Sequence, residues 1–124
     1  MSTGNLRTFN VPHVTGQTFR RTAYIWSSAS ALSSAGVSAA VQFAKDGAYI
    51  LRFASSPGVG EGSITIAQVA ADTTHPYQYL SFELVASASL ANALTDECRG
   101  FFTVTWANGD IVPYFKLQID ITTL

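Results

Sequence analysis

Two histidines are the residues of this chain best suited to binding a transition metal, and their spacing gives them no partners. His13 follows Pro12 and His75 precedes Pro76, so both are expected in turns. Neither is followed, two to four residues on, by a histidine, cysteine or carboxylate that would complete a ligand set. The sequence therefore predicts no transition-metal site.

Oxygen ligands for calcium are available at three carboxylates beside turn signals. Asp96 and Glu97 are adjacent, and Asp46 begins an Asp-Gly dipeptide. None of them belongs to a loop with the ligand spacing of an EF-hand. We therefore expect solvated turn carboxylates at these positions and no bound metal.

Catalytic side chains are equally sparse. Cys98 is the only cysteine and has no histidine near it in the sequence, which favours a buried thiol over a nucleophile. Glu61 and Glu83 are candidates for a pair of glycosidase carboxylates, but nothing around them supports the pairing. No G-x-S-x-G elbow occurs, and the glycine-rich segment 55–62 matches neither a P-loop nor a dinucleotide fingerprint. We predict a protein without catalysis and without a cofactor.

Aromatic residues make up 12% of the chain and offer a different chemistry, the stacking of sugar rings on exposed tyrosines. Tyr77, Tyr79 and Tyr114 are the tyrosines that we expect outside the core. The competing interpretation places them at the rim of a subunit interface, where tyrosine is enriched. We favour the interface, because low charge independently argues for one, and we keep a carbohydrate-binding or adhesive domain as the alternative.

The composition restricts the classes of partner. Only 12% of residues are charged and 48% are hydrophobic, so apolar side chains must occupy part of the surface. Such a surface is typical of a subunit that assembles with copies of itself or with other proteins. The seven basic and eight acidic residues form no phosphate-neutralising stripe, and no apolar run reaches the ~20 residues of a membrane span. We expect neither a nucleic-acid nor a membrane partner.

Two features bear on where the protein folds. A single cysteine allows no disulfide within the chain, which favours a reducing compartment. The first ten residues, MSTGNLRTFN, lack the basic and apolar regions of a secretory signal. We therefore expect synthesis in a cytoplasm.

The elements that must position these side chains are β-strands, and the clearest pair lies between residues 100 and 121. Two alternating runs flank Asn108-Gly109, the strongest short-range signal for a hairpin turn. Because side chains alternate along a strand, a two-residue turn there fixes which residues share a face. The predicted pairs are Trp106–Ile111, Val104–Pro113 and Phe102–Phe115 on the core face, and Thr105–Val112, Thr103–Tyr114 and Phe101–Lys116 on the other.

The second face of this hairpin is the predicted subunit interface. It mixes aromatic, aliphatic and charged side chains, so it does not have the composition of a plain solvent face. Pro113 cannot donate a ladder hydrogen bond, which places its strand at an edge or beside a bulge. The residues that we expect in the interface are Phe101, Val112, Tyr114 and Lys116.

Short runs rich in β-branched and aromatic residues predict further strands at 6–11, 17–26, 37–44, 48–53, 63–69 and 77–86. Asp46-Gly47 predicts a second hairpin but leaves its register open. Leu90 and Leu94 are four residues apart after a possible serine N-cap, which predicts one or two helical turns in 87–94.

The whole pattern predicts an all-β protein: an antiparallel β-sandwich of seven to eight strands with one short helix before the C-terminal hairpin. Residues 14–124 form the single domain of this prediction. Residues 1–13 precede it as an N-terminal arm or first strand, which Pro12 interrupts.

Four segments carry a resemblance to a known family: VTGQTFRRTAYIW, SAGVSAAVQFAKDGAYILRF, SASLANAL and RGFFTVTWANGDIVPYFKLQIDI. From about Val14 to its end, the chain resembles the small immunoglobulin-like domains of bacteriophage tail and baseplate proteins. The resemblance implies an Ig-like sandwich and a virion part without catalysis, acting as a spacer, adaptor or ring. Such domains often precede a receptor-binding tail, and a chain that stops after the sandwich favours an adaptor or decoration role.

We therefore expect a virion structural protein of a tailed bacteriophage, made in the host cytoplasm. Its expected partners are other virion proteins and copies of itself.

Overall fold

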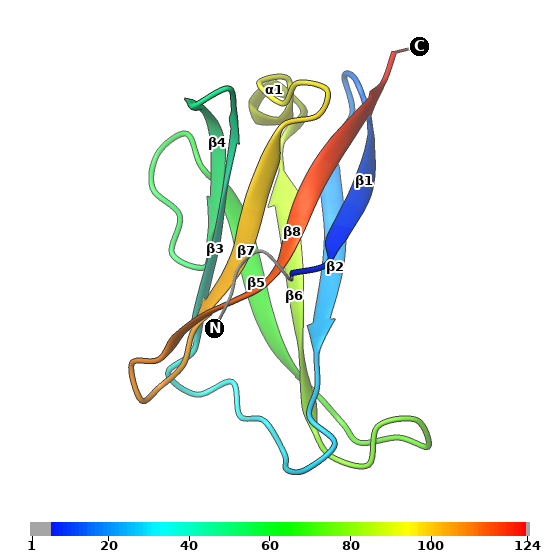
Figure 1. The fold of residues 1–124 in the computed structure, drawn as a ribbon, viewed down its shortest axis with the longest axis vertical. Helices are drawn as coiled ribbons and strands as arrows, with labels where there is room; N and C mark the ends of the chain where they lie inside the picture. The colour runs from blue at the N-terminus through cyan, green and yellow to red at the C-terminus, as the bar shows by residue number, and fades with distance from the viewer. Residues whose placement is uncertain (1–5, 124) are drawn as a thin grey trace.

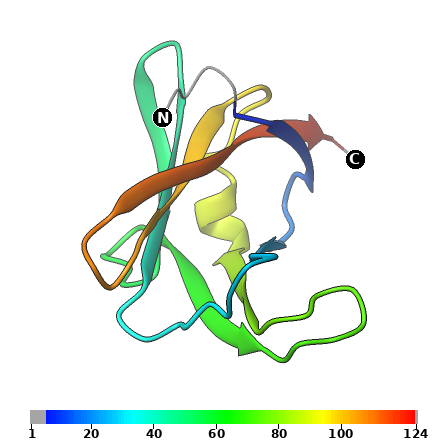
Figure 2. The same cartoon turned by 60° about the horizontal axis from the view of Figure 1, so that its bottom comes forward.

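The computed structural model describes residues 6–123, and over this range the regular secondary structure is β-strand apart from one short helix (Figure 1). The described strands form one sheet in the order β1-β8-β7-β3-β4-β5-β6-β2, curled into a nearly closed, barrel-like shape (Figure 2). The all-β prediction is confirmed. The elements are β1 Thr8–Val14, β2 Phe19–Ile25, β3 Ser38–Lys45, β4 Ala48–Ala54, β5 Gly62–Val69, β6 Tyr79–Ala86, α1 Ala88–Ala91, β7 Arg99–Thr105 and β8 Ile111–Thr122.

The short helix lies where the sequence predicts it, over one end of the barrel (Figure 1). Ser87 is its N-cap, and the Ser87 hydroxyl accepts a hydrogen bond of 3.4 Å from the backbone N–H of Leu90. This bond satisfies one of the N–H groups that a helix start leaves without a partner. Ala91 and Leu94 are buried and attach this segment to the core.

Two strand pairs are parallel, so the prediction of an antiparallel sheet is wrong at these places. β1 pairs with β8 along its whole length, although the two strands come from opposite ends of the chain. β5 begins beside the end of β4 and continues in the same direction, so the only pairs are Phe53–Gly62 and Ala54–Ser63. This stagger needs no crossover helix, because the chain does not return along β4 before it starts β5.

The two ends of the sheet, β1 and β2, meet along a seam. They are joined by a tight turn in which Gly16 has φ +88°, a value that favours glycine. Across the seam the Arg21 guanidinium donates a hydrogen bond to the carbonyl of Pro12. The ring of Phe19 lies 5.5 Å from that of His13. Side chains therefore connect the two ends where a backbone ladder does not.

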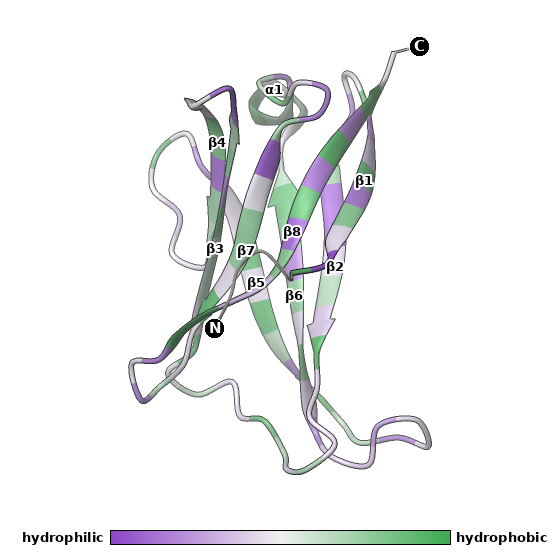
Figure 3. Cartoon of the chain, viewed as in Figure 1, coloured by the Kyte–Doolittle hydropathy of each residue, from purple (hydrophilic) through white to green (hydrophobic). Residues whose placement is uncertain are grey.

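The interior is filled by aromatic and aliphatic side chains from the inward face of each strand. Hydrophobic and polar residues alternate along the strands (Figure 3). On β6, Leu80, Phe82 and Leu84 form the inward set, since none is more than 1% exposed. The Phe82 ring lies edge-on to Phe102 with centroids 5.2 Å apart.

A close contact joins the two halves of the sheet at the short β4–β5 bridge. A Cβ atom added at Gly62 would lie 2.5 Å from Cδ2 of Phe53, well inside contact distance. The Phe53 ring is fully buried, with centroids 5.2 Å from Phe19 and 5.9 Å from Phe43. Only glycine lets the start of β5 pass this close to Phe53.

The turn of the C-terminal hairpin contains Asn108 and Gly109 as predicted, but it is one residue longer. The N–H of Gly109 donates to the carbonyl of Trp106, and the N–H of Trp106 donates to Asp110, both at 2.8 Å. Gly109 has φ +93°, the left-handed geometry that closes a three-residue hairpin turn. The predicted pairs next to the turn are therefore wrong; the observed pairs are Thr105–Ile111, Val104–Val112 and Thr103–Pro113.

A bulge at Tyr114 absorbs this one-residue shift. Beyond it, Phe102 pairs with Phe115 and Phe101 with Lys116, so these two predictions are confirmed. The bulge lies next to Pro113, as the missing proline donor predicts.

The predicted hairpin at Asp46-Gly47 also combines a tight turn with a bulge in the following strand pair. Asp46 and Gly47 both have positive φ, 52° and 80°, which suits a two-residue turn of the primed type. A bulge then shifts the register, so that Phe43 faces Leu51 and Val41 faces Phe53. All four of these side chains are buried.

The N-terminal strand differs most from prediction. β1 runs from Thr8 through Pro12 to Val14, whereas the sequence predicts a strand that Pro12 ends. Proline is tolerated here because β1 is the last strand of the sheet on its side. His13, expected in a turn, is 5% exposed within the strand. Of the predicted arm at 1–13, residues 1–5 lie outside the described residues.

The Phe53–Gly62 contact predicts that one methyl group added at position 62 has a large effect on stability. We expect Gly62→Ala to lower the free energy of unfolding by about 1–3 kcal/mol, because the new Cβ displaces the Phe53 ring. Urea unfolding followed by circular dichroism measures this loss. Gly58→Ala is the control and should change stability by less than about 0.5 kcal/mol, since its Cβ meets nothing closer than 3.6 Å. Equal effects of the two variants would contradict the prediction.

Burial of His13 predicts that stability falls with acid. Within the described residues its Nε2 has no hydrogen-bond partner. Burial, with a smaller effect of nearby Arg21, lowers the pKa of His13. The unfolded chain then binds the proton more tightly than the folded chain, so the free energy of unfolding decreases as pH falls below about 6.5.

Urea midpoints at pH 7.5 and pH 5 measure this dependence. We expect His13→Leu to reduce the difference between the two midpoints relative to the wild type. An unchanged difference in His13→Leu would show that other groups cause the loss.

Candidate binding groove on the outer face of β2, β5 and β6

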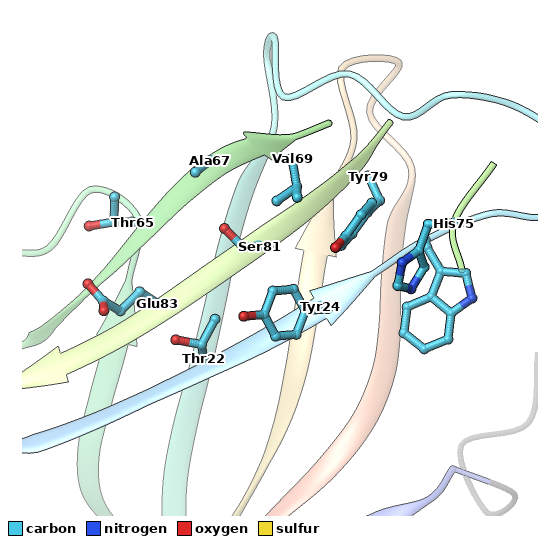
Figure 4. A pocket seen from close by; sticks show the side chains of 10 residues that line it. Thr22, Tyr24, Thr65, Ala67, Val69, His75, Tyr79, Ser81 and Glu83 are labelled. Atoms are coloured by element: carbon cyan, nitrogen blue, oxygen red, sulfur yellow. The ribbon is translucent and has the colours of Figure 1, made fainter. Parts of the chain in front are cut away.

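A groove of about 740 Å³ lies on the outer face of β2, β6 and β5 (Figure 4). We call it the β2–β5–β6 groove. Most of its lining residues alternate with core residues along these strands and therefore point away from the interior. Its lining consists of Thr22, Tyr24, Trp26, Thr65, Ala67, Val69, His75, Tyr79, Ser81 and Glu83.

The register of the three strands explains why this face is hollow. Ser81 of β6 pairs with Tyr24 of β2 on one side and with Ala67 of β5 on the other. Cross-strand neighbours on one face lie about 5 Å apart, so a large ring next to two small side chains leaves open space. The groove is therefore a consequence of residue size along one cross-strand row.

Four rings form one end of the groove. The imidazole of His75 stacks on Tyr79 with centroids 4.2 Å apart, and Trp26 meets His75 edge-on at 5.1 Å. Tyr24 lies 6.1 Å from Tyr79. Tyr79 is buried, whereas Tyr24 and Trp26 are 51% and 57% exposed. Tyr79 and His75 thus form a stacked pair of rings at the bottom of this end, and the exposed rings of Tyr24 and Trp26 stand beside it.

Asp72 holds the stacked pair of His75 and Tyr79 in place through hydrogen bonds. Its Oδ1 accepts hydrogen bonds from the backbone N–H groups of Thr74 at 2.9 Å and His75 at 2.7 Å. The Nδ1 of His75 lies 3.0 Å from Oδ1, and the Tyr79 hydroxyl donates to Oδ2 at 3.4 Å. These donors, the backbone N–H of His75 first among them, lower the pKa of Asp72. Asp72 therefore remains a carboxylate and holds the imidazole in place.

The other end of the groove is polar. Glu83 pairs with Thr22 on one side and Thr65 on the other, forming a row of two hydroxyls and a carboxylate. The Glu83 carboxylate forms an exposed ion pair with Arg20 at 3.2 Å. Charge at this end is therefore balanced within the protein.

Of the three tyrosines predicted to lie outside the core, only Tyr79 lines the groove, and it is buried. Tyr77 is exposed but does not line it. Tyr114 is half-buried, accepts a 3.0 Å hydrogen bond from Nε1 of Trp106, and has a pKa raised by burial. The exposed rings missed by the prediction are Tyr24 and Trp26, which alternation places on one face of β2.

The structure separates the four residues of the predicted subunit interface into two pairs. Phe101 and Lys116 are cross-strand neighbours on the outer face, where the Lys116 ammonium lies 5.5 Å from the centre of the Phe101 ring. Val112 pairs with buried Val104 and therefore belongs to the inward face. Tyr114, in the bulge, packs against the core. The one-residue shift at the turn is the reason for both differences.

The other chemical candidates have structural partners. Cys98 is buried, and burial raises the pKa of its thiol, which favours the protonated form. Glu61 accepts hydrogen bonds from the N–H of Gly58 and from the Arg52 guanidinium, and these lower its pKa, the Gly58 N–H most. Asp96 accepts a 2.9 Å bond from the N–H of Ile121. Across residues 6–123, no three histidines, cysteines or carboxylates gather as metal ligands.

Comparison with models of protein families finds no match, and a search of curated proteins finds none either. No helix within the described part of the chain is long and apolar enough to cross a bilayer.

The four hydrogen bonds to Asp72 predict a local effect of its removal. In Asp72→Ala, we expect the backbone amides of Thr74 and His75 to exchange with solvent faster, because both lose their acceptor. Amide hydrogen exchange by NMR measures this change. The melting temperature should move little, since Asp72 is exposed and the turn lies outside the core.

Asp72→Asn is the control, because its side-chain oxygen can still accept from both amides. Protection in Asp72→Asn should lie closer to the wild type than in Asp72→Ala. Unchanged exchange in Asp72→Ala would show that the turn is held by other contacts.

Proposed function

We propose that this protein is a virion structural protein of a tailed bacteriophage, acting without catalysis as an adaptor, ring or decoration subunit. The observation that carries the proposal is a surface with little charge and large exposed apolar side chains. Phe101 is 44% exposed and Ile111 69% exposed on the outer face of β7 and β8. A surface of this kind is typical of proteins that assemble.

The strand order supports the immunoglobulin-like part of the proposal. In Ig-like sandwiches, strands B, E and D form one sheet and C, F and G the other. With β4 counted as an additional C′ strand, β2-β6-β5 corresponds to B-E-D and β3-β7-β8 to C-F-G. Only the two residue pairs between β4 and β5 connect these halves in the sheet. An Ig-like sandwich of two such halves is the interpretation that we favour.

The proposed assembly surface is the outer β7–β8 face, which consists of Phe101, Thr103, Thr105, Ile111 and Lys116. Its side chains alternate with the core residues of β7, so none is needed to fill the interior. Within residues 6–123, the paired register of β1 with β8 begins at Thr8 and Lys116. Exposed apolar groups on a face that the core does not use favour contact with another protein.

Light scattering and association with particle components test this proposal. We expect the wild-type protein to form a defined oligomer, or to sediment with phage particles from an extract. Replacing both Phe101 and Ile111 by serine should reduce that association, because it removes apolar area from the contact. Tyr49→Ser is the control, since Tyr49 is 56% exposed but lies on β4. A wild-type monomer that binds no particle component would contradict the proposal.

A further inference from the structure

We propose that the β2–β5–β6 groove is a binding site for an uncharged glycan, which stacks on Tyr24 and Trp26. This inference is independent of the proposed virion role, because it concerns a different face of the molecule. The outer β7–β8 face and the groove share no residue.

The exposed rings carry the first part of the argument. Tyr24 points out of β2 and Trp26 follows the last residue of that strand; both line the groove and neither belongs to the core. Two large rings kept at a groove wall offer flat apolar faces to a ligand. The C–H face of a pyranose ring is flat and apolar as well, so it can pack on such rings. The groove volume of about 740 Å³ lies within the roughly 300–1,000 Å³ of small-molecule sites.

The polar row carries the second part. A sugar presents hydroxyl groups around the edge of its ring, and these require both donors and acceptors. Thr22 and Thr65 provide hydroxyls, which can do either, and Glu83 provides acceptor oxygens. Ser81 adds a hydroxyl on the floor between the polar and aromatic ends. Rings at one end and hydroxyl partners at the other match the two kinds of surface of a glycan.

The charge balance selects an uncharged ligand. The carboxylate of Glu83 is paired with Arg20, and that of Asp72 accepts from His75 and its neighbours. No free cation among the groove-lining residues remains to bind sialic acid, sulfate or phosphate. A neutral oligosaccharide therefore fits the site better than an anionic one.

The backbone of β6, at the centre of the groove, argues against an added peptide strand on the groove floor. β6 forms the centre of the groove floor and is hydrogen-bonded on both sides, to β2 and to β5. It therefore has no free ladder groups to pair with an extended peptide. The groove recognises its ligand with side chains, and three paired strands with the Asp72 turn hold these side chains before binding.

A glycan array tests the proposal on the full chain. The array should carry neutral oligosaccharides containing glucose, galactose or mannose, with sialylated and sulfated chains alongside. We expect binding to at least one neutral chain. No binding to any neutral chain, or a preference for the anionic ones, would overturn the proposal.

Calorimetry with the best neutral oligosaccharide then locates the site. Tyr24→Ala and Trp26→Ala should each weaken the Kd by about tenfold or more, while Tyr49→Ala leaves it unchanged. Circular dichroism verifies that the variants fold, which we expect because both rings are more than half exposed. Equal binding by the wild type and both groove variants would place the ligand elsewhere and refute the site. A proline-rich peptide is added to the sugar-free protein as a second test. If this peptide shifts the NMR signals of the groove residues and no sugar binds, the proposal is also refuted.

Light scattering of the same variants keeps the two proposals separable. Tyr24→Ala and Trp26→Ala should assemble as the wild type does, because they leave the outer β7–β8 face intact. Failure of glycan binding would then leave the assembly result standing, and failure of assembly would leave the groove result standing.

Discussion

The contact between the Phe53 ring and the backbone at Gly62 is the constraint on which the rest of the fold depends. It lies at the short parallel bridge that joins the two halves of the sheet. Phe53 also packs against Phe43 from its own half and Phe19 from β2, the far end of the sheet. The Phe53 ring thus connects the β4–β5 bridge between the halves to the seam between β1 and β2. A Cβ at position 62 would displace the Phe53 ring and loosen the packing that joins the two halves.

Most elements of this fold could be predicted because their signals are local. The alternation of Leu80, Phe82 and Leu84, the Asp46-Gly47 turn and the serine-capped helix each depend on a few neighbouring residues. Register could be predicted only in part: Phe102–Phe115 and Phe101–Lys116 are confirmed, whereas the three-residue turn and the bulge at Tyr114 shift the pairs between them. The parallel pairing of β1 with β8 also lacks a local signal, since it joins opposite ends of the chain.

The candidate groove was only partly accessible to prediction, for a related reason. Alternation along β2 places Tyr24 and Trp26 on one face, but it does not say which face is outside. That depends on the pairing of Tyr24 with Ser81 and of Ser81 with Ala67. These residues lie on β2, β6 and β5, three separate strands of the chain. The spacing pattern of metal ligands concerns residues that follow His75, whereas its partner Asp72 precedes it by three.

The parallel β1–β8 pair has a mechanical consequence. The chain enters β1 at Thr8, beside Lys116, and leaves β8 at Thr122, beside Val14, so these two points lie at opposite ends of one ladder. Tension between them pulls the two strands past each other along their length. All the hydrogen bonds of the ladder then bear the load together and must break together, whereas a hairpin pulled from its open end would separate one pair at a time. The fold therefore resists stretching along its long axis through a strand pairing that no local sequence signal predicts.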